Sequence, residues 1–186
     1  MKDVTDDKAN ELGIRLRPIT LSDVEAIMTW INDPEITKNF AGFNDPITRD
    51  SEAAFIAKMA ASQTDHLYAI VDRADVAIGT AGIHQIYRPA GNGRLGIMLG
   101  RGRGRGWGRK ALELLVQIAF EQLHLHKVWI VHFADNARMA HLCEVLGFKV
   151  EGVLREEYFH RDRHWDMVRE SLLAHEYRAA HALPSE

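Results

Sequence analysis

The chain has 186 residues, of which 46% are hydrophobic and 26% are charged, a composition typical of one soluble globular domain with its own core. A formal net charge of −3 argues against a general nucleic-acid binder. The one cysteine, Cys143, excludes an intramolecular disulfide, and no apolar run is long enough to cross a membrane. We therefore expect neither a membrane nor a nucleic acid among the partners.

The chain divides by composition into three parts. We predict a flexible N-terminal tail at residues 1–12, a single domain at residues 13–176 and a C-terminal tail at residues 177–186. The first residues, MKDVTDDKANEL, are acidic and polar and contain no apolar segment, so they do not resemble a secretory leader. Together with the single cysteine, this favours a cytoplasmic location.

The first half of the domain alternates between short strands and amphipathic helices. Its predicted elements are a strand at 14–18, a helix from Thr20 that Asn32-Asp33-Pro34 stops, a helix at 48–62, and strands at 67–71 and 76–87. A loop with strong turn residues follows at 88–93.

The second half continues with strands and helices in alternation. Its predicted elements are a strand at 95–99, a glycine-rich loop, a helix that ends near Leu123, a buried strand at 127–133, a helix from Asn136 that Gly147 closes, and a hairpin at 148–159 and 164–173. This order predicts an α/β fold, with a mixed, mostly antiparallel central sheet of about seven strands and about four helices.

Glycines occupy every second position from Gly100 to Gly108, between an apolar strand and an amphipathic helix, and arginines alternate with them. Backbone N–H groups without obstructing side chains, a helix N-terminus and cationic side chains together favour phosphate binding. The spacing matches neither a G-x-G-x-x-G dinucleotide fingerprint nor a P-loop, because Arg, Trp or Ala stands where a third glycine is needed and Ala111 follows Lys110. An RNA-binding Arg-Gly tail is the alternative, but such tails do not continue into an amphipathic helix.

Two ordered motifs indicate a family. The segment Arg103–Gly108 fits R-x-x-G-x-G and resembles the acetyl-CoA pyrophosphate loop of the GNAT N-acetyltransferases. Residues 136–148, NARMAHLCEVLGF, resemble the N-x-x-A-x-x-L-Y-E-x-x-G-F segment of the same family. The resemblance covers roughly residues 14–174 and implies a GNAT-like acyl-CoA N-acyltransferase fold.

Two further segments resemble one branch of that family. Trp30–Pro34 is similar to a W-x-N-D-P opening, and Gly152–Glu156 with Asp166 is similar to a G-x-x-R-E…D ending. Both are features of the branch grouped with ribosomal-protein alanine and serine acetyltransferases (RimJ/RimL-like).

The resemblance implies acetyl-CoA as cosubstrate and no metal. The expected pyrophosphate-binding residues are Arg103, Gly104, Arg105, Gly106, Trp107 and Gly108. The family's fourth strand splays from the fifth, so the backbone near Met98 would hold the thioester carbonyl and Met98 with Leu99 would flank the pantetheine arm. Asn136 would hydrogen-bond that arm, or only cap its helix.

The resemblance leaves the catalytic pair open. Many relatives use a strand-four glutamate as general base and a tyrosine as general acid, whereas this chain has Arg94 and Cys143 at about those places. Cys143 is the candidate acid, with an inert core position as the alternative. His84 is the candidate base, with a structural or substrate-facing role as the alternative. His132 is a weaker candidate because its strand looks buried.

These observations predict an acetyl-CoA-dependent N-acetyltransferase that acts on a primary amine by direct attack in a ternary complex. The acceptor is expected to be a small-molecule amine, such as a polyamine or amino sugar, or a protein N-terminal amine. Glu156, Glu157 and Tyr158 are candidate contacts for a cationic acceptor, and a homodimer is allowed for. The alternatives are a catalytically weak CoA-binding regulatory module of the same fold and an RNA-binding protein that uses the Arg-Gly loop.

Overall fold

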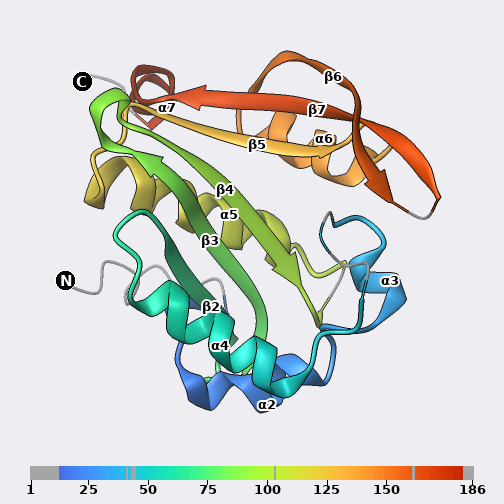
Figure 1. Ribbon diagram of the computed structural model, residues 1–186. Helices are drawn as coiled ribbons and strands as arrows, with labels where there is room; N and C mark the ends of the chain where they lie inside the picture. Colours follow the sequence, from blue (N-terminus) through green and yellow to red (C-terminus); the bar gives the residue numbers. More distant parts are fainter. Residues whose placement is uncertain (1–12, 41, 43–44, 103, 161, 182–186) are drawn as a thin grey trace.

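The computed structural model describes residues 13–40, 42, 45–102, 104–160 and 162–181, and its seven strands form one sheet (Figure 1). In spatial order the strands are β1 (Ile14–Pro18), β2 (His66–Asp72), β3 (Ala77–Tyr87), β4 (Asn92–Leu99), β5 (Lys127–Phe133), β7 (Arg163–Leu173) and β6 (Lys149–His160). Only β4 and β5 pair in parallel. The predicted mixed, mostly antiparallel sheet is confirmed.

The helices outnumber the four that the sequence predicted. Within the described residues they are α2 (Val24–Met28), α3 (Pro34–Thr37), α4 (Arg49–Ala60), α5 (Trp107–Gln117), α6 (Ala137–Val145) and α7 (Ala174–His181). The helix that the sequence predicted up to Asn32-Asp33-Pro34 already ends at Met28, and Pro34 begins α3, because proline at the first helical position loses no hydrogen bond. The Asp33 carboxylate accepts the Glu35 N–H at 2.9 Å and caps this short helix.

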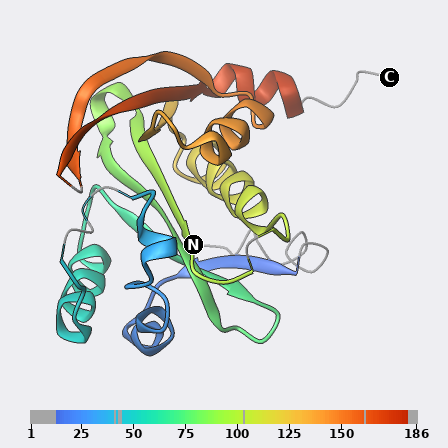
Figure 2. The same cartoon turned by 90° about the vertical axis from the view of Figure 1, so that its right-hand side faces the viewer.

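The helices cover both faces of the sheet (Figure 2). Alternation along β2 shows the division, since Tyr68 and Ile70 belong to the core under α5 while Ala69 and Val71 belong to the core under α2 and α4. The larger core centres on α5, whose Leu112 and Leu115 are fully buried. Within the described residues, no helix combines the length and apolar character that a membrane span requires.

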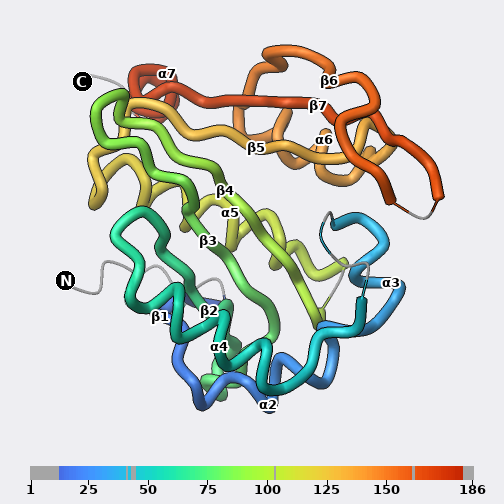
Figure 3. The backbone as a smooth tube through the Cα atoms, in the orientation of Figure 1, coloured from blue at the N-terminus to red at the C-terminus, as the bar shows by residue number. Residues whose placement is uncertain are grey.

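The strands β4 and β5 separate soon after they meet. Their parallel pairing covers only Asn92–Arg94 against Lys127–Trp129, and β5 then pairs with β7 along its whole length. Figure 3 shows the two backbones diverging beyond this point. The edge of β4 from residue 95 to residue 99 therefore has no partner strand on the β5 side. The splay implied by the family resemblance is present.

The helix α7 extends across the predicted start of the C-terminal tail at residue 177. Tyr177 is buried, its ring centroid lies 5.0 Å from that of Phe120, and its hydroxyl donates to Glu121 at 2.6 Å. The domain therefore continues at least to His181. The short polar stretch gave little helical signal by itself, because its one buried aromatic residue is recognised only by its packing against the core around α5.

We expect Tyr177→Ala to lower the free energy of unfolding by about 3 kcal/mol, since it removes a buried aromatic ring from the core. Arg178→Ala, an exposed change on the same helix, should alter it by less than about 0.5 kcal/mol. Urea denaturation of the two variants measures both values. Equal stability would mean that α7 is not integral to the domain.

Candidate active site

A cavity of about 710 Å³ lies where β4 leaves β5. Its walls include Arg94–Met98 of β4 and Trp129, Val131 and His132 of β5. Residues of β3, α4 and the β6–β7 hairpin complete it. The cavity thus borders the open edge of β4, where backbone groups without a strand partner can bond a ligand.

The glycine loop before α5 is shaped by left-handed backbone. Gly102, Gly104 and Gly106 have φ angles of +72°, +83° and +76°, values that side-chain-bearing residues rarely adopt. A Cβ atom added at Gly104, Gly106 or Gly108 would meet no atom of the described residues within 4 Å, so these residues leave the space in front of the helix N-terminus open. The first N–H groups of α5 lack intrahelical partners and suit an anion there.

The loop's charged and aromatic side chains have different roles. The Arg105 guanidinium lies over the Trp107 ring, 5.2 Å from its centroid. Trp107 packs so closely on Gly102 that a Cβ atom there would lie 2.2 Å from its ring. Arg101 donates to the Thr29 hydroxyl at 2.9 Å, which ties the loop to the α2 side of the fold. The remaining predicted contact, Arg103, falls outside the described residues.

His84 lies in the cavity wall beside β4, over a pair of glycines. Gly82 and Gly96 face each other across β3 and β4, and a Cβ atom at Gly82 would lie 2.2 Å from His84 Nε2. The imidazole therefore occupies space that a side chain at Gly82 would fill, and it lies in ordinary contact distance of Gly96. Its Nδ1 lies 3.2 Å from Asp65 Oδ1. Because an ionised carboxylate only accepts, Nδ1 carries the hydrogen and Nε2 is left as an acceptor.

The surroundings of His84 keep it neutral. Burial lowers its pKa below the ordinary value of 6.5, and the positive charge of Arg94 lowers it further, while Asp65 acts in the opposite direction. Burial also acts to raise the Asp65 pKa, but hydrogen bonds led by those from Ser62 and Thr64 outweigh it and lower that pKa. An ionised Asp65 thus orients a neutral imidazole, which is the arrangement of a general base.

Sequence reasoning missed Asp65 and also missed Glu52. Glu52 is only 5% exposed on α4, yet it lines the cavity, and burial raises the pKa of its carboxyl group. Within the described part of the chain, no group hydrogen-bonds its carboxylate. Glu157 and Tyr158, two of the predicted acceptor contacts, line the same cavity. A buried carboxylate in the wall of a cavity, without a hydrogen-bond partner among the described residues, suits a cationic ligand.

Cys143, the candidate general acid, lies outside the cavity wall. Its side chain is fully buried on α6 and is not among the residues lining the cavity. Burial, followed by the nearby charge of Glu170, raises its pKa to about 12. Because ordinary thiols titrate near pH 8.5, proton transfer from Cys143 to a departing thiolate would be unfavourable by roughly 3–4 pH units. These surroundings favour the inert core position of Cys143 over its role as general acid. That role stays a prediction.

The remaining predicted contacts surround the divergence of β4 and β5. Met98 lines the cavity, whereas Leu99 packs against the α5 core and is not part of the cavity wall. Asn136 caps α6, since its side-chain oxygen accepts the Met139 N–H at 3.2 Å. The capping alternative is thus present, and its amide nitrogen remains able to donate to a ligand.

Comparison with known proteins identifies the family. The model described as "Acetyltransferase (GNAT) domain" matches residues 14–149. The chain belongs to the GNAT family. The "Uncharacterized N-acetyltransferase p20" of Bacillus licheniformis is 29% identical over 88% of this chain and 94% of its own length. Spermidine N(1)-acetyltransferase of Escherichia coli K12 is 30% identical over 45% of each chain.

Solved structures agree on the fold. The spermidine N-acetyltransferase of Vibrio cholerae, solved with CoA and spermine, superposes with a TM-score of 0.82 at 24% identity, over 89% of this chain and 98% of its own. This GNAT protein is accordingly an N-acetyltransferase, and its cosubstrate is acetyl-CoA. Membership of the ribosomal-protein acetyltransferase branch, a cytoplasmic location and a homodimer stay predictions.

The Gly82–Gly96 pair offers a matched test of the His84 position. We expect Gly82→Ala to displace the imidazole from Asp65 and expose it to water, so that the His84 pKa rises toward 6.5. Gly96→Ala should leave it unchanged, because a Cβ atom there lies 3.7 Å from the ring, an ordinary contact. Titration of the imidazole signals by NMR measures both. An unchanged pKa in Gly82→Ala would show that the ring does not depend on this glycine.

The donor loop is tested by Gly106→Val. A branched residue with a φ of +76° is strained, and its side chain enters the open space at the start of α5. We expect acetyl-CoA affinity to fall about 100-fold or more, since charge-assisted hydrogen bonds contribute ~1.5–3 kcal/mol each. Gly152→Val, which is also in open space but without positive φ, should bind normally. Calorimetry on folded variants decides, and unchanged affinity in Gly106→Val would move the pyrophosphate site elsewhere.

Proposed function

We propose that this GNAT enzyme transfers the acetyl group of acetyl-CoA to a primary amine of a small molecule that carries a second positive charge. The observation that supports this most is one cavity lined by the open edge of β4, a neutral His84 and the unpaired carboxylate of Glu52. These are the groups that an acetyl donor, a reacting amine and a distal ammonium each need.

On this proposal the donor enters from the α5 side. The N–H groups at the start of α5, with Arg105, hold the pyrophosphate, and the pantetheine arm follows the open edge of β4 past Met98. The free backbone N–H groups of that edge then stabilise negative charge on the carbonyl oxygen as the amine attacks. Asn136 can contact the arm through its amide nitrogen.

His84 is the proposed base. The neutral amine nitrogen attacks the thioester carbon, the C–N bond forms, the C–S bond breaks, and CoA leaves as a thiolate that takes one proton from water. Nε2 of His84 accepts the proton that the attacking nitrogen loses, and Asp65 stabilises the resulting imidazolium. Arg94, which stands where many relatives carry a glutamate base, favours the neutral form of His84. The proposed base therefore lies on β3, whereas many relatives carry theirs on the strand that corresponds to β4.

The acceptor class follows from the acidic wall. Glu52 and Glu157 line the cavity, and a buried carboxylate without a partner is stabilised by a cation that brings its own charge. The similar proteins named for spermidine acetylation make a di- or polyamine the first acceptor to test. A CoA-binding module without turnover is the alternative, favoured by the arginine at the usual glutamate position.

The test is thiol release from acetyl-CoA with matched diamines and monoamines of equal length. We expect turnover with diamines, and Glu52→Gln should raise their KM by about 10-fold or more while kcat and the monoamine KM change little, because the lost ion pair is remote from the reacting nitrogen.

Asp50→Asn, an exposed acid-to-amide change on the same helix, is the control and should behave like the parent protein. Equal effects of Glu52→Gln on diamine and monoamine would remove Glu52 from acceptor recognition. Bound acetyl-CoA with no thiol release for any amine would favour the CoA-binding module.

A further inference from the structure

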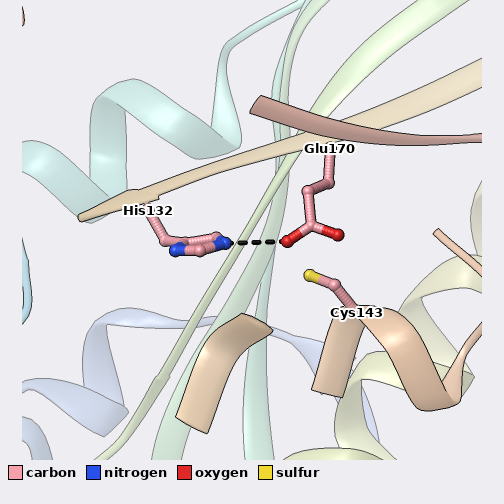
Figure 4. A group of neighbouring side chains, drawn as sticks. All are labelled: His132, Cys143 and Glu170. Atoms are coloured by element: carbon pink, nitrogen blue, oxygen red, sulfur yellow. Dashed lines mark hydrogen bonds and ion pairs between the residues drawn. The ribbon is translucent and has the colours of Figure 1, made fainter. Parts of the chain in front are cut away.

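Three side chains from three elements meet in the core beside the cavity (Figure 4). His132 of β5, Cys143 of α6 and Glu170 of β7 place a nitrogen, a sulfur and an oxygen within 4.8 Å of one another. All three are buried, with at most 5% of the side chain exposed for His132 and Glu170 and none of Cys143. Such a polar cluster needs a physical reason, since apolar residues pack a core at less cost.

The hydrogen bonds around His132 orient its free nitrogen. Nδ1 lies 2.8 Å from the Phe133 carbonyl oxygen, which only accepts, so Nδ1 carries a hydrogen. Nε2 lies 2.9 Å from Glu170 Oε1. In a neutral ring with its hydrogen on Nδ1, Nε2 is an acceptor, as the carboxylate oxygen is, so two acceptor atoms at this separation need a proton or a metal cation between them. A proton satisfies this requirement, and so does a metal ion. A metal-binding histidine usually donates a hydrogen bond from its other ring N–H, for example to a backbone carbonyl oxygen.

We propose that His132, Cys143 and Glu170 bind one divalent cation of the zinc class, with water as the fourth ligand. Nitrogen, thiolate sulfur and carboxylate oxygen are ligands that zinc prefers. One thiolate and one carboxylate balance the two positive charges of the ion, so the occupied site is neutral, as burial requires. Binding replaces the thiol proton by a sulfur–metal bond and also releases the proton shared by His132 and Glu170.

Small shifts can bring the three ligand atoms to the distances that zinc requires, and an ion can reach them from the cavity. Tetrahedral zinc places its ligand atoms about 3.3–3.6 Å apart, so the longest separation has to shorten by roughly 1 Å and the His132–Glu170 pair has to open slightly. His132 also lines the cavity, which gives the ion and its water an entry path. The occupied site would link β5, β7 and α6 beside the cavity, and it shares no residue with the proposed acetyl-transfer groups.

The decisive experiment uses tag-free, full-length protein freed of metal with a chelator. Zinc titration against a chromophoric chelator should give one equivalent per chain, and cobalt substitution should produce a thiolate-to-cobalt charge-transfer band. Cys143→Ser, His132→Gln and Glu170→Gln should each weaken zinc binding by more than ~10-fold, the scale on which even the outer partners of metal ligands act.

His141→Gln and Glu144→Gln are the controls, because both residues are exposed on the same helix α6 and should leave zinc binding unchanged. Circular dichroism checks the fold of each variant, and the cobalt spectrum of the parent protein decides by itself if a cluster variant fails to fold. Absence of the thiolate band, or zinc affinity that is the same in Cys143→Ser and Glu170→Gln as in the parent, would overturn the proposal and leave a buried hydrogen bond.

Discussion

The early end of hydrogen bonding between β4 and β5 is the constraint on which the rest of this structure depends. The strands pair only as far as Arg94 and Trp129, whereas β5 pairs with β7 on its other edge along its whole length. A buried amide without a partner costs about 1–3 kcal/mol, so the open edge of β4 has to bond water or a ligand. The cavity forms along this edge, and the glycine loop that follows β4 starts α5 beside it. One gap in the sheet therefore brings together the glycine loop, the free backbone of β4 and the acidic residues of the cavity, the three parts that the proposed reaction needs.

Burial and hydrogen bonding shift the pKa values of the titratable groups around the cavity. Arg94 places a cation where the family resemblance implies a carboxylate, and its charge adds to burial in lowering the pKa of His84, the base that we propose on β3. Asp65 then orients the imidazole without protonating it, since hydrogen bonds from Ser62 and Thr64 help to keep that carboxylate ionised. Among the described residues Glu52 has no such partners, which is why we propose its carboxylate as the group that a cationic ligand stabilises. Burial also raises the pKa of Cys143, which favours its core role, while its role as the general acid stays a prediction.

Much of the fold follows from local pattern. The β-rich run Lys127–Phe133 was predicted with its observed bounds, and the glycine loop was correctly placed between a strand and an amphipathic helix. Short elements escaped prediction, since α3 depends on one cap and α7 depends on a single buried tyrosine. Asp65 and Glu52 escaped for a different reason. Each is an ordinary acidic residue in a polar stretch, and only its surroundings distinguish it.

The sequence by itself determined the order of the main strands and helices, the position of the glycine loop and the family, because periodicity, glycine spacing and motifs act over short stretches of chain. Only the tertiary structure decided which polar groups face one another. His84 reaches Asp65 across 19 positions and His132 reaches Glu170 across 38. Such pairings arise when strands distant in sequence enter one sheet, and the free energy of burying a charged or polar group is set by that assembled environment.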